Sequence, residues 1–313
     1  MLQKVERDRR SPYLICPLKK LYNSIVMKQK IIDLFDEYTH TALPRRVFFT
    51  RLVALAGSTA AATALLPLLE NNYAKAVMVD EKDPQLSTEF LSYSGTSGAM
   101  RGYLAKPKNI SGELPAVIVI HENRGLNAHI QDVARRAALA GYVALAPDFL
   151  SPVGGTPQNE DQARDLISAL DSQQTLGNLK ATLAFLQNRP DTTSKVGCVG
   201  FCWGGGMTNQ LAVSTSQLGA AIAFYGSPPP ADAVPNIQSP VLLHYAGLDE
   251  RINQEIPAYE NALRTAGKDY TICLYSSVNH AFHNDTNEAR YDENAANLAW
   301  ERSMAFFDYY LKA

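Results

Sequence analysis

Residues 196–206 read VGCVGFCWGGG, and this stretch decides the fold that the sequence predicts. Its first half, which ends at Phe201, is short and almost entirely apolar, as is typical of a strand buried on both faces of a sheet. An apolar helical stretch begins directly after Cys202. Because Gly200 and Gly204 lack a Cβ atom, the strand and helix backbones can approach each other closely at the turn between them. The pattern indicates a strand–turn–helix elbow that presents Cys202 as a candidate nucleophile.

Strand-like and helix-like segments alternate from about residue 87 to the end of the chain. Their alternation indicates the α/β class, with a mostly parallel sheet covered by helices on both faces. We predict a single domain of this kind over residues 77–313. The predicted strands are 116–120, 142–146, 196–201, 220–224, 241–245 and 270–275, and the predicted helices are 128–140, two stretches within 158–188, 253–266 and 287–312.

Four reactive side chains follow predicted strands, namely Glu122, Cys202, Asp249 and His280. Ligand chemistry in α/β sheets gathers at the carboxyl ends of the strands, so we expect these groups to lie close together. The chain order of nucleophile, acid and histidine is the order found in α/β-hydrolases. In such a triad His280 takes the thiol proton, and Asp249 fixes the imidazole tautomer and stabilises the imidazolium.

The residues alone leave alternatives for each member of this set. Cys202 could be a buried structural cysteine, and Asp249 could only cap the following helix while Glu250 serves as the acid. His283 could replace His280 as the base. Position directly after the strands favours Asp249 and His280.

Three cysteines occur after residue 76, at Cys198, Cys202 and Cys273, and this odd number argues against a disulfide framework. A thiol redox protein that pairs Cys198 with Cys202 is a rival hypothesis. The two residues are four apart across a strand end, so we expect their side chains to point apart. A second rival is an exported binding protein that keeps the fold but has a degenerate pocket.

Cofactor and nucleic-acid binding are disfavoured by the sequence. His121, His129 and His244 do not have the spacing of a metal site, and the glycines at 204–206 lack the lysine of a phosphate-binding loop. The formal net charge of −2 indicates no nucleic-acid partner. We therefore expect a small-molecule substrate, no metal and no cofactor.

The first 76 residues differ from the rest, with a formal charge of +6 against −8 for residues 77–313. The pair Arg45-Arg46 precedes an apolar run from Leu52 to Leu69, and Ala74-Lys75-Ala76 offers a cleavage site. These features predict a twin-arginine-type leader over residues 1–76, cleavage after Ala76 and a periplasmic mature domain without stable membrane insertion. The alternatives are an uncleaved membrane anchor and an amphipathic helix that packs on the body, and Met27 is an alternative start to Met1.

With these motifs placed, the chain resembles the dienelactone hydrolase family, or carboxymethylenebutenolidases, over about residues 87–312. The resemblance rests on five blocks: GFCWGG at 200–205, HENRGLN at 121–127, Pro147-Asp148, AGLD at 246–249 and NHAF at 279–282. Together the blocks are far more specific than the elbow alone. The resemblance implies an α/β-hydrolase fold and the hydrolysis of an ester or lactone through a cysteine acyl-enzyme.

The resemblance also implies roles for residues around the triad. Glu122 is expected to face Cys202 and to keep the thiol neutral until substrate displaces the carboxylate; the alternative is a salt bridge between Glu122 and Arg124. The oxyanion hole is expected from the backbone N–H groups of Trp203 and Asn123. The Trp203 side chain would line the substrate pocket or serve only in packing.

Recognition of a substrate carboxylate is where the chain departs from the family pattern. Arg164 is compatible with one of two family arginines, but Asn284 stands four residues after His280, where the other is expected. Arg124 could supply the missing charge. An activated ester or enol lactone is therefore expected as substrate, while dienelactone itself is in doubt.

Overall fold

The computed structural model describes residues 17–75, 78–109 and 112–313, and its contacts divide the chain into two compact units. The first unit is Met1–Leu69 and the second is Glu70–Ala313. The expected cleavage point between Ala76 and Val77 lies outside the described residues. The leader boundary at that bond, and Met1 as the start, therefore stay predictions.

The N-terminal unit consists of helices α1 (Pro17–His40), α2 (Arg45–Ala56) and α3 (Thr59–Leu69). Its core is aromatic, with the rings of Tyr38 and Phe48 stacked at a centroid distance of 4.4 Å. Gly57 ends α2 in the left-handed region with φ of 83°, and its N–H donates to the carbonyl of Val53. The apolar run of the predicted leader is therefore broken into two helices.

The apolar segment of this unit forms a bent pair of helices rather than one long helix. Among the described residues, no single helix combines the length and apolar composition needed to cross a membrane. Helices α2 and α3 reach that composition only together, and their axes are bent by 113° at the break.

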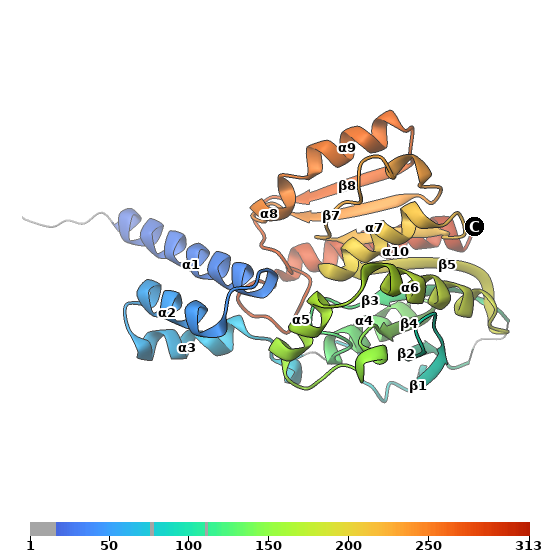
Figure 1. Cartoon of the computed structure of the whole chain (residues 1–313), viewed down its shortest axis with the longest axis horizontal. Coiled ribbons are helices and arrows are strands. Elements are labelled where there is room, and N and C mark those ends of the chain that lie inside the picture. The colour runs from blue at the N-terminus through green and yellow to red at the C-terminus, as the bar shows by residue number, and fades with distance from the viewer. Residues whose placement is uncertain (1–16, 76–77, 110–111) are drawn as a thin grey trace, which may run out of the picture. The chain divides into compact units, whose positions relative to one another are not determined.

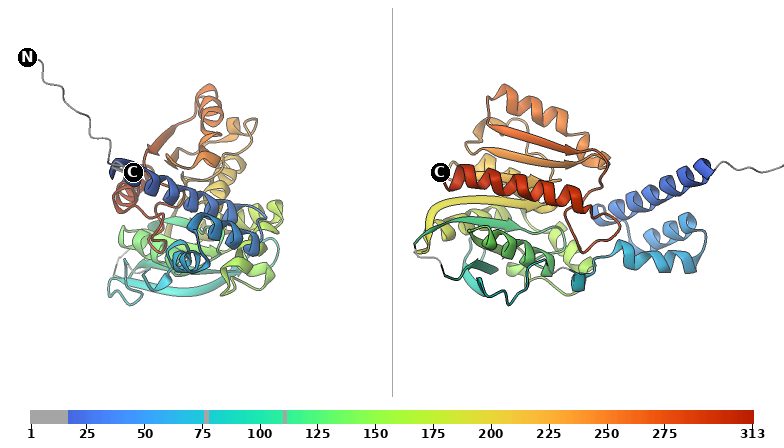
Figure 2. Two further views of the ribbon diagram at one scale, coloured as in Figure 1. Left: turned by 90° about the vertical axis from the view of Figure 1, so that its left-hand side faces the viewer. Right: turned by 180° about the vertical axis from the view of Figure 1, so that it is seen from behind.

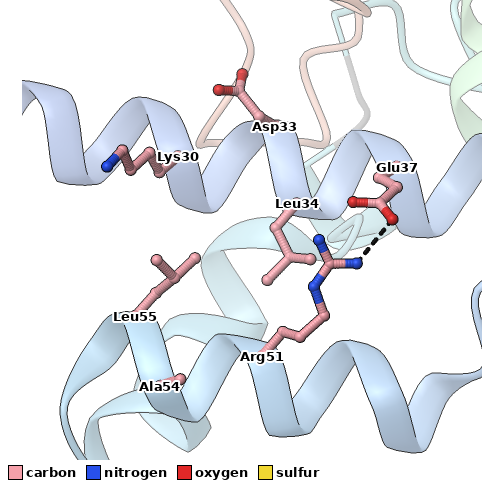
Figure 3. Close-up of a pocket in the computed structure, with 7 residues that line it drawn as sticks. All are labelled: Lys30, Asp33, Leu34, Glu37, Arg51, Ala54 and Leu55. Atoms are coloured by element: carbon pink, nitrogen blue, oxygen red, sulfur yellow. Dashed lines mark hydrogen bonds and ion pairs between the residues drawn. The ribbon is translucent and has the colours of Figure 1, made fainter.

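A pocket of about 400 Å³ lies between α1 and α2 of the same unit (Figure 3). Arg51 crosses it and donates to the carboxylate of Glu37 at 2.7 Å. The pocket contains none of the predicted catalytic residues, so it is separate from the candidate active site. Its lining residues are Lys30, Asp33, Leu34, Glu37, Arg51, Ala54 and Leu55.

The described part of the C-terminal unit is built on one eight-stranded sheet with strand order β1-β2-β4-β3-β5-β6-β7-β8. Strand β2 pairs antiparallel with β1 and β4, and all other neighbours are parallel, which confirms the predicted sheet. The sequence did not resolve β1 and β2 individually. The strands are β1 (Leu86–Ser94), β2 (Ala99–Pro107), β3 (Leu114–Ile120), β4 (Val143–Asp148), β5 (Thr192–Phe201), β6 (Ala220–Phe224), β7 (Val241–Ala246) and β8 (Tyr270–Tyr275).

Helices cover both faces of this sheet (Figures 1 and 2). Helices α4 and α10 pack on one face, and α6, α7 and α9 pack on the other. The helices are α4 (Ala128–Leu139), α5 (Glu160–Ser168), α6 (Ser172–Gln187), α7 (Trp203–Ser214), α8 (Glu250–Asn253), α9 (Ile256–Thr265) and α10 (Glu293–Leu311), with short turns η1 (Tyr73–Lys75), η2 (Ser151–Val153) and η3 (Val234–Asn236).

Two predicted helices have different bounds in the structure. The helix predicted to begin at residue 287 begins at Glu293, because the Asp292 side chain caps it by accepting from the N–H of Ala295. The helix predicted over 253–266 is α9, which begins three residues later at Ile256 with Pro257 in its first turn, and the short helix α8 before it was not predicted.

The two thiols on either side of the β5 terminus lie in different core layers. Cys198 packs in the layer under α6 and α7, whereas Cys202 packs in the layer of α4 and α10. Burial raises the pKa of the Cys198 thiol to about 12. The side chains point apart, as predicted, which argues against a redox pair.

A buried ionic network connects α4 to two segments that are distant in the sequence. Asp132 is fully buried and accepts hydrogen bonds from the backbone N–H of Val79 at 2.8 Å and from Nε of Arg136 at 2.6 Å. Arg136 also donates to Asp285 at 2.8 Å, in the loop after β8. Arg135 completes the set with a hydrogen bond to the Val79 carbonyl at 2.8 Å.

We predict that Asp132→Ala lowers the free energy of unfolding by about 3–5 kcal/mol, because it leaves buried arginines without their carboxylate. Urea denaturation followed by circular dichroism measures the change. Asp232→Ala, at an exposed loop position, is the matched control and should change stability by less than about 0.5 kcal/mol. Equal effects of the two substitutions would show that the network does not stabilise the fold.

Candidate active site

Cys202 occupies a strained turn between β5 and α7. Its backbone has φ of 56° and ψ of −114°, a region that side-chain-bearing residues rarely adopt. A Cβ atom on Gly204 would lie 2.5 Å from the carbonyl oxygen of His121, and one on Gly200 would overlap the Gly204 carbonyl. The elbow therefore requires glycine on both sides of the cysteine, as the sequence indicated.

The structure brings Cys202, His280 and Asp249 together at the carboxyl edge of the sheet. Nδ1 of His280 lies 2.5 Å from Oδ2 of Asp249, and both residues are only 4% exposed. A ring nitrogen of His280 and the Sγ of Cys202 lie within 4.8 Å of each other. The carboxylate can hold the imidazole in the tautomer whose Nε2 accepts a proton from the thiol.

The alternatives for the acid and the base lie elsewhere. Glu250 is exposed in the first turn of α8, whereas Asp249 both binds His280 and accepts from the N–H of Ile252 at 3.2 Å. His283 is buried, and its ring lies 5.0 Å from that of Phe201. Burial holds the pKa of His283 well below its usual value, so this ring is a neutral packing group.

Glu122 is buried and receives two hydrogen bonds from neutral donors. Nδ2 of Asn284 donates to Oε2 at 2.6 Å, and the hydroxyl of Tyr225 lies 3.4 Å from Oε1. Within the described residues, Arg124 forms ion pairs with Glu160 and Asp161 and none with Glu122. The alternative of a Glu122–Arg124 salt bridge is therefore wrong, because the guanidinium turns toward the start of α5.

Tyr225, which was not among the predicted site residues, lies among the candidate catalytic groups. It directly follows β6, has φ of 38°, and its ring lies 4.8 Å from that of His280. Burial, followed by the charges of Glu122 and Cys202, raises the pKa of Tyr225 well above its usual value, so it remains a hydrogen-bond donor. Its position at the end of a predicted strand was the signal that could have identified it.

Trp203 packs over His121 rather than standing alone beside the cysteine. The two rings are stacked with centroids 5.2 Å apart, and Phe149 meets Trp203 edge-on at 5.6 Å. Nε2 of His121 accepts from the Phe149 N–H at 3.3 Å, so Nδ1 carries the proton and donates to the Glu122 carbonyl at 2.6 Å. The Trp203 side chain thus packs on these rings, and because it is not fully buried, its role in lining the substrate pocket stays a prediction.

The remaining predicted residues lie at the start of α7, in the loop after β3 and on α5. Trp203 is the first residue of α7 and Asn123 follows Glu122 in the loop after β3, which are the positions expected of an oxyanion hole. Arg164 lies on α5, where its guanidinium contacts Asp165 at 2.8 Å. Arg164 and Arg124 both also lie 3.6 Å from Asp161, so each predicted substrate arginine is paired with acidic groups.

Comparison with known proteins agrees with this geometry. The sequence model of the dienelactone hydrolase family matches residues 100–311. A putative carboxymethylenebutenolidase of Escherichia coli O157:H7 is 32% identical over 249 residues, which cover 75% of this chain and 92% of the relative. A probable 2-oxo-3-(5-oxofuran-2-ylidene)propanoate lactonase of Bradyrhizobium sp is also 32% identical, over 69% of this chain and 92% of its own length.

A solved structure supports the same assignment. The crystal structure of a putative dienelactone hydrolase from Klebsiella pneumoniae is 32% identical in sequence and superimposes with a TM-score of 0.66, covering 72% of this chain and 99% of its own. The strand order, the elbow and the sequence match therefore lead to one conclusion: the chain is an α/β-hydrolase-fold member of the dienelactone hydrolase family.

Proposed function

We propose that the chain hydrolyses an ester or lactone through a thioester formed on Cys202. The observation that carries this proposal is the buried 2.5 Å contact between His280 and Asp249, with the thiol within 4.8 Å of the same imidazole. A base that is oriented by a carboxylate and lies near a nucleophile is the arrangement that acyl transfer requires.

In the first step, His280 accepts the thiol proton and the sulfur attacks the substrate carbonyl. The backbone N–H groups of Trp203 and Asn123 stabilise the oxyanion, and the N-terminus of α7 adds its dipole. Collapse of the intermediate breaks the carbon–oxygen bond, and the imidazolium protonates the leaving oxygen. Water, activated by His280, then hydrolyses the thioester and restores the thiol.

Glu122 keeps the resting thiol neutral in this proposal. A buried carboxylate disfavours a nearby thiolate by like-charge repulsion, and a neutral thiol resists oxidation. The bonds from Asn284 and Tyr225 support this role because they hold the carboxylate inside the site. Substrate would displace it and allow the proton transfer to His280.

Substrates with good leaving groups fit this chemistry best. The names of the relatives, a carboxymethylenebutenolidase and a lactonase of an oxofuranylidene acid, point to enol lactones and activated esters. Asn284 places no positive charge at the position where the family pattern has an arginine. Arg124 and Arg164 remain the candidates for binding an acidic substrate group.

We also propose that residues 1–76 serve as a twin-arginine-type leader and that residues 77–313 act as a periplasmic enzyme. The order of Arg45-Arg46, the apolar run and the Ala74-Lys75-Ala76 site supports export. Export in a folded state would shelter the Cys202 thiol from oxidation.

We predict that Cys202→Ala lowers kcat for p-nitrophenyl acetate by about 10³-fold or more, because only binding and the oxyanion hole remain. Cys273→Ala removes a partly exposed thiol on β8 and should leave kcat within about twofold. Iodoacetamide should inactivate both the wild-type chain and the Cys273 variant. Turnover that resists iodoacetamide would contradict the cysteine mechanism.

We predict that Asp249→Asn lowers kcat by about 10²- to 10⁴-fold with little change in KM, because the amide cannot stabilise the imidazolium. Steady-state kinetics with p-nitrophenyl acetate measures the loss. Glu250→Gln tests the alternative acid and should leave kcat unchanged, since its side chain is exposed. The reverse pattern would assign the acid to Glu250.

We predict that Glu122→Gln raises the rate of Cys202 alkylation by iodoacetamide on the order of tenfold, because one buried like charge is removed. The glutamine carbonyl retains an acceptor for Asn284. Mass spectrometry of the alkylated peptide over time gives the rate, with Glu250→Gln as a charge-matched control. An unchanged or slower reaction would remove the gating role from Glu122.

A further inference from the structure

The short segment Asn71–Tyr73 contacts residues around the candidate active site, although it precedes the predicted cleavage site. The backbone N–H of Asn72 donates to the carbonyl of Thr286 at 2.8 Å, in the loop that also carries Asn284. The hydroxyl of Tyr73 donates to the carboxylate of Glu160, and Nδ2 of Asn71 donates to the same oxygen at 3.0 Å. The segment thus bridges the loop after His280 and the start of α5.

Glu160 in turn holds Arg124. NH1 of Arg124 donates to the Glu160 backbone carbonyl at 2.8 Å, and Nε lies 3.9 Å from the carboxylate oxygen that Tyr73 and Asn71 leave unused. Arg124 is 6% exposed, whereas the Glu160 side chain is 25% exposed. Arg124 follows Glu122 by two residues in the loop after β3, and its guanidinium turns from that loop toward the start of α5.

The two donors fix the orientation of the Glu160 carboxylate. With one oxygen bound to Tyr73 and Asn71, the other faces the guanidinium. Without these bonds, a side chain in the first turn of α5 can rotate into water and weaken its pair with Arg124. Among the described residues, Arg124 then keeps only one acidic partner, Asp161, whose carboxylate lies 3.6 Å from NH1. Asn127 supports the arrangement by donating to the Tyr73 hydroxyl at 3.1 Å.

Tyr73 remains a donor over the range of ordinary assays. Burial, and after it the negative charge of Glu160, raises the pKa of Tyr73 well above its usual value, and Glu122 contributes in the same direction. The hydroxyl therefore stays protonated.

We propose that Tyr73 and Asn71 are positioning residues that set substrate specificity by holding Glu160 against Arg124, so that Arg124 is withheld from a substrate carboxylate. The inference rests on the proposed function and adds a substrate class to it. With the segment in place the site favours neutral esters and lactones, and without it the site accepts acidic ones. Cleavage after Ala76 would remove both residues and would have the same effect.

The test compares two substrates with the same leaving group in the full-length chain. These are p-nitrophenyl butyrate, which is neutral, and mono-p-nitrophenyl glutarate, which carries a carboxylate. In the double variant Asn71→Ala/Tyr73→Phe, KM for the glutarate ester should fall by roughly five- to tenfold with kcat unchanged, because Arg124 loses one of its two acidic partners and can pair with the substrate carboxylate. The kinetics of the neutral ester should not change.

Matched variants separate this role from a structural one. Tyr309→Phe removes a tyrosine hydroxyl at a position 71% exposed on α10 and should leave both substrates unaffected. Glu160→Gln should lower KM for the glutarate ester in the same way as the double variant. Adding Arg124→Gln to the double variant should abolish this decrease in KM for the glutarate ester. The proposal would be overturned if the ratio of the two KM values stayed unchanged in the double variant. It would also be overturned if KM for the glutarate ester stayed low after Arg124→Gln was added.

A second readout does not depend on turnover. The alkylation ratio is the rate at which anionic iodoacetate modifies Cys202 divided by the rate for neutral iodoacetamide. This ratio should rise roughly five- to tenfold in the double variant. If the wild-type chain hydrolyses neither ester, the proposed function fails, yet the alkylation ratio still decides the role of Tyr73 and Asn71. An alkylation ratio that stays constant while both esters are hydrolysed rejects only the specificity proposal.

Discussion

The close approach of β5 and α7 around Cys202 is the constraint on which the rest of the site depends. Holding a residue with a side chain at φ of 56° costs about 1–3 kcal/mol, which the surrounding structure must offset. Two backbone bonds do so, from the Cys202 N–H to the Phe224 carbonyl at 3.0 Å and from the Gly206 N–H to the Cys202 carbonyl at 3.1 Å. Because one partner ends the neighbouring strand β6 and the other lies in the first turn of α7, the Cys202 backbone has a fixed position against which the other groups are placed.

Buried charge is the second feature on which the proposed chemistry of the site depends. The two buried carboxylates, Asp249 and Glu122, have different hydrogen-bond partners. Asp249 lies against an imidazole that can become positive, so its charge is useful when His280 takes a proton. Glu122 instead receives one hydrogen bond on each carboxylate oxygen from the uncharged side chains of Asn284 and Tyr225. In the proposed gate this difference matters, because an ion pair with arginine would weaken the repulsion between a carboxylate and an anionic sulfur.

The sequence predicted the sheet and the proximity of Cys202, His280 and Asp249 because strand ends and glycine spacing are local signals. Tyr225 was not predicted as a site residue because an aromatic residue after a strand belongs to no recognised catalytic motif. The partner of Arg124 was also beyond prediction, since Glu160 lies 36 residues further on and the contact depends on how the loop before α5 folds. The start of α10 was predicted six residues too early, because hydrophobic periodicity does not show which residue caps the helix, and here the cap is Asp292.

Asn284 shows how a single departure from a family pattern can change a site in two ways. Its side chain turns inward, donating to Glu122 while its oxygen accepts from the hydroxyl of Thr286 at 2.6 Å and from that residue's N–H at 3.1 Å. An arginine in this place would bring a positive charge to Glu122 and to an acidic substrate together, coupling the two. With asparagine, the proposed function assigns the two roles to separate residues, the gate to Glu122 and the recognition of substrate charge to Arg124 and Arg164. That separation allows a change in substrate class without any change in how the thiol is kept neutral.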